Sequence, residues 1–141
     1  MIDDFFDNCL YFTVNKLSRA ITKMAEDSFK KTGLSPTHAF LMMLVIDKPG
    51  ISQSELADAL HLKPSTITRF VDKLVEKGLI ERKTEGKRSL NFPTENGEAI
   101  LKDIKDGWKI LYRAYSDVLG EEEGKALNKL VNEAGSKLEK Q

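Results

Sequence analysis

Apolar residues recur at helical spacing along most of the chain, and the breaks between these stretches predict six helices and one hairpin. The first predicted helix covers residues 3–30 and is followed by Gly33. Ser35 and Pro36 form a cap and first turn for a second helix over 37–47. Two long helices are predicted near the C-terminal end, over 95–119 and 121–139. The pattern therefore indicates a mainly helical protein.

Two short helices joined by a tight corner are predicted between residues 52 and 78. Ser52 and Glu55 form a capping box at the start of the first. The second begins near Pro64, ends before Gly78 and has an apolar face at i, i+3, i+4, i+7 spacing, made of Ile67, Phe70, Val71 and Leu74. Its other face carries Ser65, Arg69, Asp72 and Lys73, with Thr66 and Thr68 at the edges. This layout is typical of a helix-turn-helix, whose second helix enters the major groove of DNA.

A hairpin is predicted directly after these two helices. Leu79 and Ile80 begin a strand, residues 83–88 turn around Gly86, and Leu90 and Phe92 alternate in the return strand. The fold class we predict is mainly α with a small β-hairpin wing. It consists of a winged helix-turn-helix region, 35–94, flanked by helical regions 1–34 and 95–141.

The flanking helices carry wide apolar stripes that a small hairpin domain cannot cover. Packing these helices together, and against the same helices of a second copy, buries the stripes at the lowest cost. We therefore expect a two-fold homodimer.

Charge is distributed unevenly along the chain. The 141 residues have a net charge of zero, but residues 63–88 hold eight Lys or Arg against four Asp or Glu. This local excess favours a DNA partner, and a dimer would present it twice. The apolar runs are too short to span a membrane, the acidic N-terminus is unlike a signal peptide, and the single cysteine, Cys9, fits a reducing cytoplasm.

Several polar side chains are therefore candidate DNA contacts. Arg69 could bond both acceptors of a guanine, and Ser65, Thr66 and Thr68 could reach bases or phosphates. The remaining candidates are Lys63 and Lys73 beside the second helix, Lys83, Lys87 and Arg88 in the wing, and Ser52 and Gln53 at the start of the first helix. We expect Arg82 to anchor the hairpin through an acidic partner, and Asp72 to orient Arg69 or Lys73.

Three motifs together resemble the MarR family of bacterial transcription regulators. They are Glu55-Leu-Ala-Asp-Ala-Leu-His-Leu, Ser65-Thr-Ile-Thr-Arg-Phe-Val-Asp-Lys-Leu and Glu76-Lys-Gly-Leu-Ile-Glu-Arg82, and Thr94-Glu-Asn-Gly97 extends the likeness. The resemblance implies a sequence-specific repressor that binds a pseudo-palindromic operator as a homodimer. The wing departs from the family pattern Asp-x-Arg, because the matching positions are Glu85 and Lys87. A lysine keeps the charge but lacks the planar bidentate geometry of arginine.

The resemblance also implies a small aromatic or anionic effector that releases the repressor from DNA. Such effectors bind between the dimer helices and the winged domain in the family. By analogy the pocket would be lined by Phe12, His38, Met42, Trp108 and Tyr112. Apolar residues at helical spacing are more often plain core, so both interpretations stay open.

Other functions find less support in the sequence. Some family members sense hydroperoxides through a cysteine in the first helix, but that position aligns with Tyr11, and we expect Cys9 to be packed among Phe5, Phe6 and Phe12. The only histidines are His38 and His61, so neither a metal site nor another cofactor is expected. The chain has no Ser/His/Asp set and no glycine-rich phosphate loop, which argues against an enzyme. The alternatives that remain are a winged helix that binds another protein and a thiol-based redox-sensing regulator that acts through Cys9.

Overall fold

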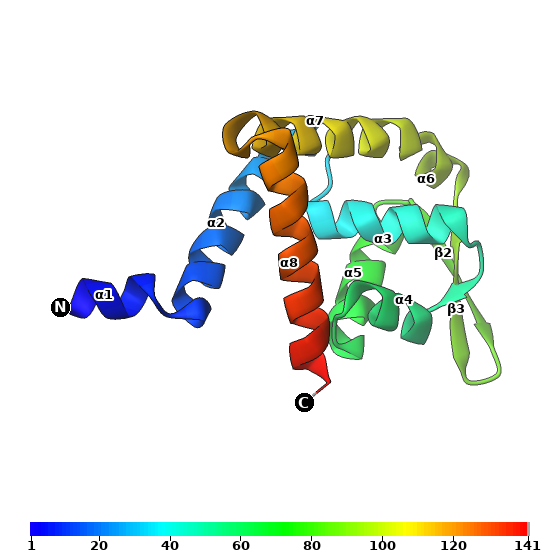
Figure 1. Cartoon of the computed structure of the whole chain (residues 1–141). Coiled ribbons are helices and arrows are strands. Elements are labelled where there is room, and N and C mark those ends of the chain that lie inside the picture. Colours follow the sequence, from blue (N-terminus) through cyan, green and yellow to red (C-terminus); the bar gives the residue numbers. More distant parts are fainter. Residues whose placement is uncertain (141) are drawn as a thin grey trace. The chain divides into compact units, whose positions relative to one another are not determined.

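The computed structural model describes residues 1–140, which form two compact units joined through the chain (Figure 1). Residues Phe29–Gly107 make up one of them, called here the winged unit. Residues 1–28 together with the chain from Trp108 onward make up the other, called the helical unit.

The winged unit contains every strand that the structure describes. Its elements are the 3-10 turn Lys30–Thr32, α3 (Pro36–Asp47), β1 (Ile51–Ser52), α4 (Gln53–Leu60), α5 (Pro64–Glu76), β2 (Ile80–Glu85), β3 (Arg88–Pro93), α6 (Glu95–Ala99) and the first turns of α7 (Leu101–Leu119). The helical unit contains α1 (Ile2–Asp7), α2 (Leu10–Ser28), the rest of α7, and α8 (Glu121–Glu139). The predicted fold class, mainly α with a β-hairpin wing, is confirmed.

The sheet has the order β1-β3-β2 and is antiparallel throughout. Strands β2 and β3 pair from Ile80↔Pro93 to Glu85↔Arg88, which is the predicted wing. The third strand, β1, was not predicted. Its Ile51 pairs with Asn91, whose fully buried side chain donates from Nδ2 to the Ile51 carbonyl oxygen at 3.0 Å.

Side chains from three helices form the core of the winged unit. The fully buried ones include Leu41, Met42 and Val45 of α3, Leu56 of α4, and Ile67, Val71 and Leu74 of α5. The apolar face predicted for α5 therefore points inward, and its polar face is left to solvent.

Local signals fix both ends of the corner between α4 and α5. Ser52 caps α4 and forms the predicted capping box with Glu55. His61 ends α4 in the left-handed region with a φ of 56°, and the Leu62 amide donates to the Ala57 carbonyl. Gly78, with a φ of 75°, ends α5 in the same manner.

Two of the predicted helices are interrupted in the structure. The helix expected over 3–30 breaks at Asn8 and Cys9 and ends at Ser28. At the break, the Asn8 side chain donates from Nδ2 to the Asp4 carbonyl at 2.7 Å and closes α1. The helix expected over 95–119 divides at Ile100 into α6 and α7.

The prediction that Cys9 is packed is wrong, since this thiol is exposed. Among residues 1–140, no helix combines the length and the apolar character needed to cross a bilayer.

Candidate nucleic-acid interface

The outer face of α5 is polar and accessible. Ser65, Thr68, Arg69 and Lys73 are exposed on it, while Thr66 is half-buried at its edge. Lys63, the N-cap residue, is exposed and makes no side-chain cap, so the positive end of the helix dipole is available to an anion. These are the groups that the sequence predicted for this face, and they belong to one helix of the winged unit.

The wing presents a second set of cations. Lys83, Lys87 and Arg88 are all exposed, and Gly86 supports the tight turn between the strands with a φ of 62°. The ammonium of Lys83 lies 5.0 Å from the centre of the Phe92 ring, a cation–π distance. The side chain of Lys83 is therefore held along the hairpin.

Ion pairs tie the wing to the two helices. Arg82 of β2 pairs through Nη2 with Asp72 Oδ1 of α5, which confirms Arg82 as the anchor of the hairpin. Asp72 was expected to orient Arg69 or Lys73, and its partner in the structure is Arg82 instead. Arg88 lies with Nη2 3.4 Å from Glu55 Oε1, so the strand β3 is also linked to α4.

Glu55 is the centre of the second link. Its carboxylate pairs with Lys48 and accepts from the Ser52 amide at 3.3 Å and the Ser52 hydroxyl at 3.0 Å. The bond from Lys48, followed by those from Ser52, lowers the pKa of Glu55 to about 2. Glu55 therefore remains a carboxylate at any physiological pH.

The two candidates at the start of α4 differ in their surroundings. Ser52 is buried and its hydroxyl is engaged in the capping box, so we assign it to the stability of α4 and not to DNA contact. Gln53 is half-buried and bridges two other segments: its Nε2 donates to Thr68 Oγ1 at 3.0 Å, and its Oε1 accepts from Ser89 Oγ at 3.4 Å. Sequence reasoning missed Ser89, because the residues of this bridge are far apart in the chain.

The five candidate effector residues are divided between the units. In the winged unit Met42 is fully buried in the core, and the His38 ring lies edge-on to Phe70 with 4.5 Å between ring centres. His38 Nε2 is buried without a hydrogen-bond partner in residues 1–140. Burial, followed by the charges of Lys77 and Lys73, lowers the pKa of His38 below its ordinary value of 6.5. The imidazole is consequently neutral at pH 7.

The other three candidates, Phe12, Trp108 and Tyr112, belong to the helical unit. The Phe12 ring stacks on Phe6 with 5.0 Å between centres, and Trp108 is half exposed. The Tyr112 hydroxyl lies 3.4 Å from Glu121 Oε1.

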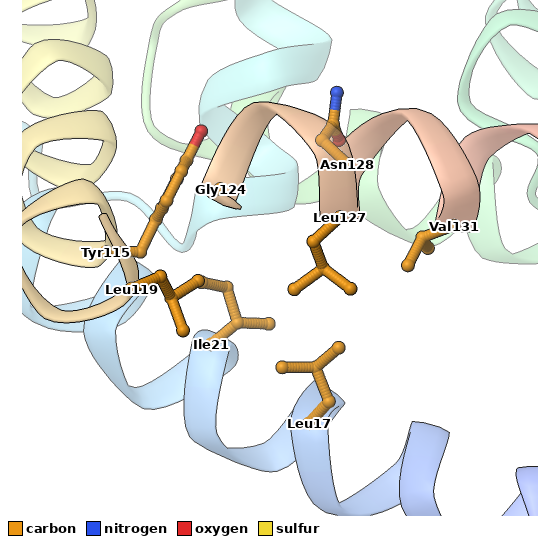
Figure 2. A pocket seen from close by; sticks show the side chains of 8 residues that line it. All are labelled: Leu17, Ile21, Tyr115, Leu119, Gly124, Leu127, Asn128 and Val131. Carbon is orange, nitrogen blue, oxygen red and sulfur yellow. The ribbon is translucent and has the colours of Figure 1, made fainter. Parts of the chain in front are cut away.

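A separate apolar pocket of about 240 Å³ opens in the helical unit, and it contains none of these five candidates. Figure 2 shows Leu17 and Ile21 of α2 facing Leu119 of α7 and Leu127 and Val131 of α8. The surrounding surface is apolar as well. Of the sixteen large apolar side chains that are exposed among residues 1–140, fifteen belong to the helical unit and one, Val75, to the winged unit.

Comparison with known proteins connects this geometry to a family. Residues 34–86 match the MarR family. The transcriptional repressor MdtR of Bacillus subtilis is 29% identical over 100 residues, which are 69% of this chain and 64% of MdtR, so the matched part spans less than two thirds of that relative. A riboflavin kinase of Thermococcus kodakarensis is 46% identical over 56 residues, but these are 40% of this chain and only 26% of the kinase.

A solved structure shares the fold over nearly its whole length. The transcriptional repressor CouR, solved with p-coumaroyl-CoA bound, superposes with a TM-score of 0.85 at 18% identity and covers 93% of this chain and 94% of its own. The short kinase match transfers no enzymatic activity, because three quarters of the kinase lie outside it. Residues 34–86 thus carry a MarR family match, and the chain as a whole is similar to winged helix-turn-helix transcription regulators of that family.

Proposed function

We propose that this regulator is a sequence-specific repressor that acts as a homodimer on a pseudo-palindromic operator. One observation carries the proposal: the exposed polar face of α5 lies in the same unit as an exposed basic wing, in a chain whose net charge is zero. Residues 35–94 would contact DNA, and residues 1–34 with 95–141 would form the dimer.

The side chains divide into two roles. Arg69, exposed in the middle of α5, is placed to read a guanine with its two parallel donors. Lys63, Lys73, Lys83 and Lys87 hold phosphates, and Ser65 and Thr66 at the start of α5 contribute shorter polar contacts. Arg88 joins the phosphate contacts when a phosphate replaces Glu55 as its partner.

The apolar surface of the helical unit supports the dimer. Side chains such as Leu17, Leu130 and Val131 are exposed in the single chain, and a patch of this kind marks an interaction surface. A second copy offers the same helices, so a two-fold arrangement covers both surfaces at once. Each α5 would then enter one major groove, with half-sites about 10 base pairs apart.

We also propose that a small aromatic or anionic effector releases the protein from DNA. The support is the solved neighbour CouR, which binds p-coumaroyl-CoA. Phe12, His38, Met42, Trp108 and Tyr112 stay the candidates for contact with such a molecule, and p-coumaroyl-CoA is the first probe to use. Loss of operator binding on its addition, reversed by dilution, is the expected result.

The test of DNA recognition is selection of bound duplexes from a random pool at stated salt concentrations. A two-fold related sequence should be enriched, and its affinity should fall steeply as salt rises, because neutralised phosphates release counterions. Enrichment of no sequence, with weak binding that does not depend on salt, would contradict the proposal and favour the alternative of a winged unit that binds another protein.

A further inference from the structure

The side chain of Gln53 connects the recognition helix α5 to the wing through two hydrogen bonds, and a third bond within α5 continues the chain. Gln53 Nε2 lies 3.0 Å from Thr68 Oγ1, and Gln53 Oε1 lies 3.4 Å from Ser89 Oγ. Thr68 Oγ1 in turn lies 3.0 Å from the Pro64 carbonyl oxygen one turn earlier in α5. The three segments α4, α5 and β3 all belong to the winged unit.

The chemistry of the last acceptor fixes the direction of the whole chain. A carbonyl oxygen can only accept, and a threonine hydroxyl has one hydrogen, so Thr68 donates this hydrogen to Pro64. Gln53 must then turn its amide N–H toward Thr68, since a second acceptor there would meet no hydrogen. Its Oε1 is left for Ser89, which donates. Along the chain from the wing to the start of α5, each group therefore donates to the next: Ser89 to Gln53, Gln53 to Thr68, and Thr68 to Pro64.

This direction limits what Thr68 can offer to a ligand. Its hydrogen is used within the helix and one lone pair is used by Gln53, which leaves one lone pair on a side chain that is exposed on the outer face. In the major groove the hydrogen-bond donors are the amino groups N6 of adenine and N4 of cytosine, whereas guanine and thymine present acceptors.

We infer that Thr68 reads one base of the operator as an acceptor, selecting adenine or cytosine, and that Gln53 is the positioning residue that holds Thr68 in this state. The inference rests on the proposed function, because it assumes that α5 lies in the major groove. A threonine without such neighbours rotates its hydroxyl and serves as donor or acceptor, and so separates the four bases poorly. Gln53 therefore acts on specificity through Thr68.

The experiment uses the full-length protein and the operator obtained by selection, with each base pair of a half-site replaced in turn. For the unaltered protein, one position should prefer adenine or cytosine on the strand that faces α5. Replacement by guanine or thymine there should weaken binding by about threefold to tenfold, the effect of one neutral hydrogen bond. Thr68→Val should remove the preference at this position alone, and Gln53→Met should reduce it at the same position.

Two controls separate specificity from a loss of structure. Thr68→Ser retains the hydroxyl and should retain the preference. Affinity for an unrelated duplex is measured in parallel for all these proteins, and only the relative affinities for the single-base variants are compared, so a general loss of binding does not count as a loss of preference. A Thr68-dependent position that requires guanine or thymine, or unchanged base preferences in Thr68→Val, would overturn the inference and leave the repressor proposal intact. Failure of the unaltered protein to select any sequence would overturn both.

Discussion

Arg82 in the strand β2 pairs with Asp72 on the exposed face of α5, so the recognition helix and the wing are joined directly. Both side chains are partly exposed, at 33% and 56%, and solvent screening keeps the contribution of such a pair to stability small. A double-mutant cycle of Asp72→Ala and Arg82→Ala, followed by urea unfolding, should give a coupling energy of about 0.2–1 kcal/mol that shrinks at high salt. The combination of Asp72→Ala with Lys83→Ala serves as the uncoupled control. A zero coupling at low salt would contradict the pairing.

The two classes of DNA contact predict two different losses. Arg69→Ala should cost about 1–3 kcal/mol of binding and relax the preference at one base position. Lys87→Ala should weaken every sequence alike and reduce the salt dependence of binding. Affinities for the selected operator and for its single-base variants, measured at three salt concentrations, distinguish them. If both variants lost the same affinity for every DNA sequence, the division into a base contact and a phosphate contact would be wrong.

Gly97 is confined by the backbone of another segment. A Cβ atom at this position would lie 2.2 Å from the Leu79 carbonyl oxygen and 3.1 Å from Met42 Cε. The Leu79 oxygen cannot move freely, because it accepts from the Thr94 amide at 3.1 Å. Gly97→Ala should therefore lower the free energy of unfolding by about 1–3 kcal/mol.

Gly135 provides the matched control for that substitution. It lies in α8, and a Cβ there meets no atom within 4 Å. Gly135→Ala should be neutral or raise the free energy of unfolding by up to about 1 kcal/mol, because alanine favours a helix over glycine. Equal destabilisation by both substitutions would show that the contact with Leu79 is not the cause.

The lowered pKa of Glu55 predicts a stability that depends on acid. Its pKa of about 2 lies below the ordinary 4.5, so the carboxylate stabilises the folded state fully above pH 4.5. The contribution is lost as pH falls from 4.5 through about 2. Urea unfolding of the unaltered protein and of Glu55→Gln should differ most at pH 6–7, and the difference should narrow below pH 4.5. A constant difference down to pH 3 would refute the assignment.

Exposed apolar residues of the helical unit should govern association. Leu130, 65% exposed in α8, is suited to Leu130→Glu, which should shift the protein toward monomer in sedimentation at micromolar concentration and weaken operator binding. Val75→Glu is the control, because Val75 is an exposed apolar residue of the winged unit, and it should leave the mass unchanged. If the unaltered protein sediments as a monomer at this concentration, the proposed homodimer is wrong.

Local signals explain which elements could be predicted from the sequence. Helix α3 begins at Pro36 behind the cap Ser35, and α5 begins at Pro64 and ends before Gly78, so neither needed distant partners to be found. The break at Asn8 could not be found, because the apolar pattern continues across it and neither Pro nor Gly marks it. The two-residue strand β1 exists only through its pairing with β3, some forty residues away.

The candidate site shows the same limit. The polar face of α5 follows from the spacing of its apolar residues, and the positive wing follows from counting charges. The bridge through Gln53 could not be predicted from the sequence, because it depends on which atoms of Thr68 and Ser89 the Gln53 amide contacts in the folded chain. A hydrogen-bond direction is set by geometry among segments, and spacing within one segment carries no information about it.

The order of the strands has a consequence for solubility. With β3 in the middle, β2 and β1 are the two edges of the sheet. An open edge is a template for strands of other chains, and proteins suppress such addition with charged residues or with very short strands. Strand β2 carries Glu81, Arg82, Lys83 and Glu85, and β1 is only two residues long. The charges of the wing thus also protect it from edge-to-edge aggregation when no DNA is bound.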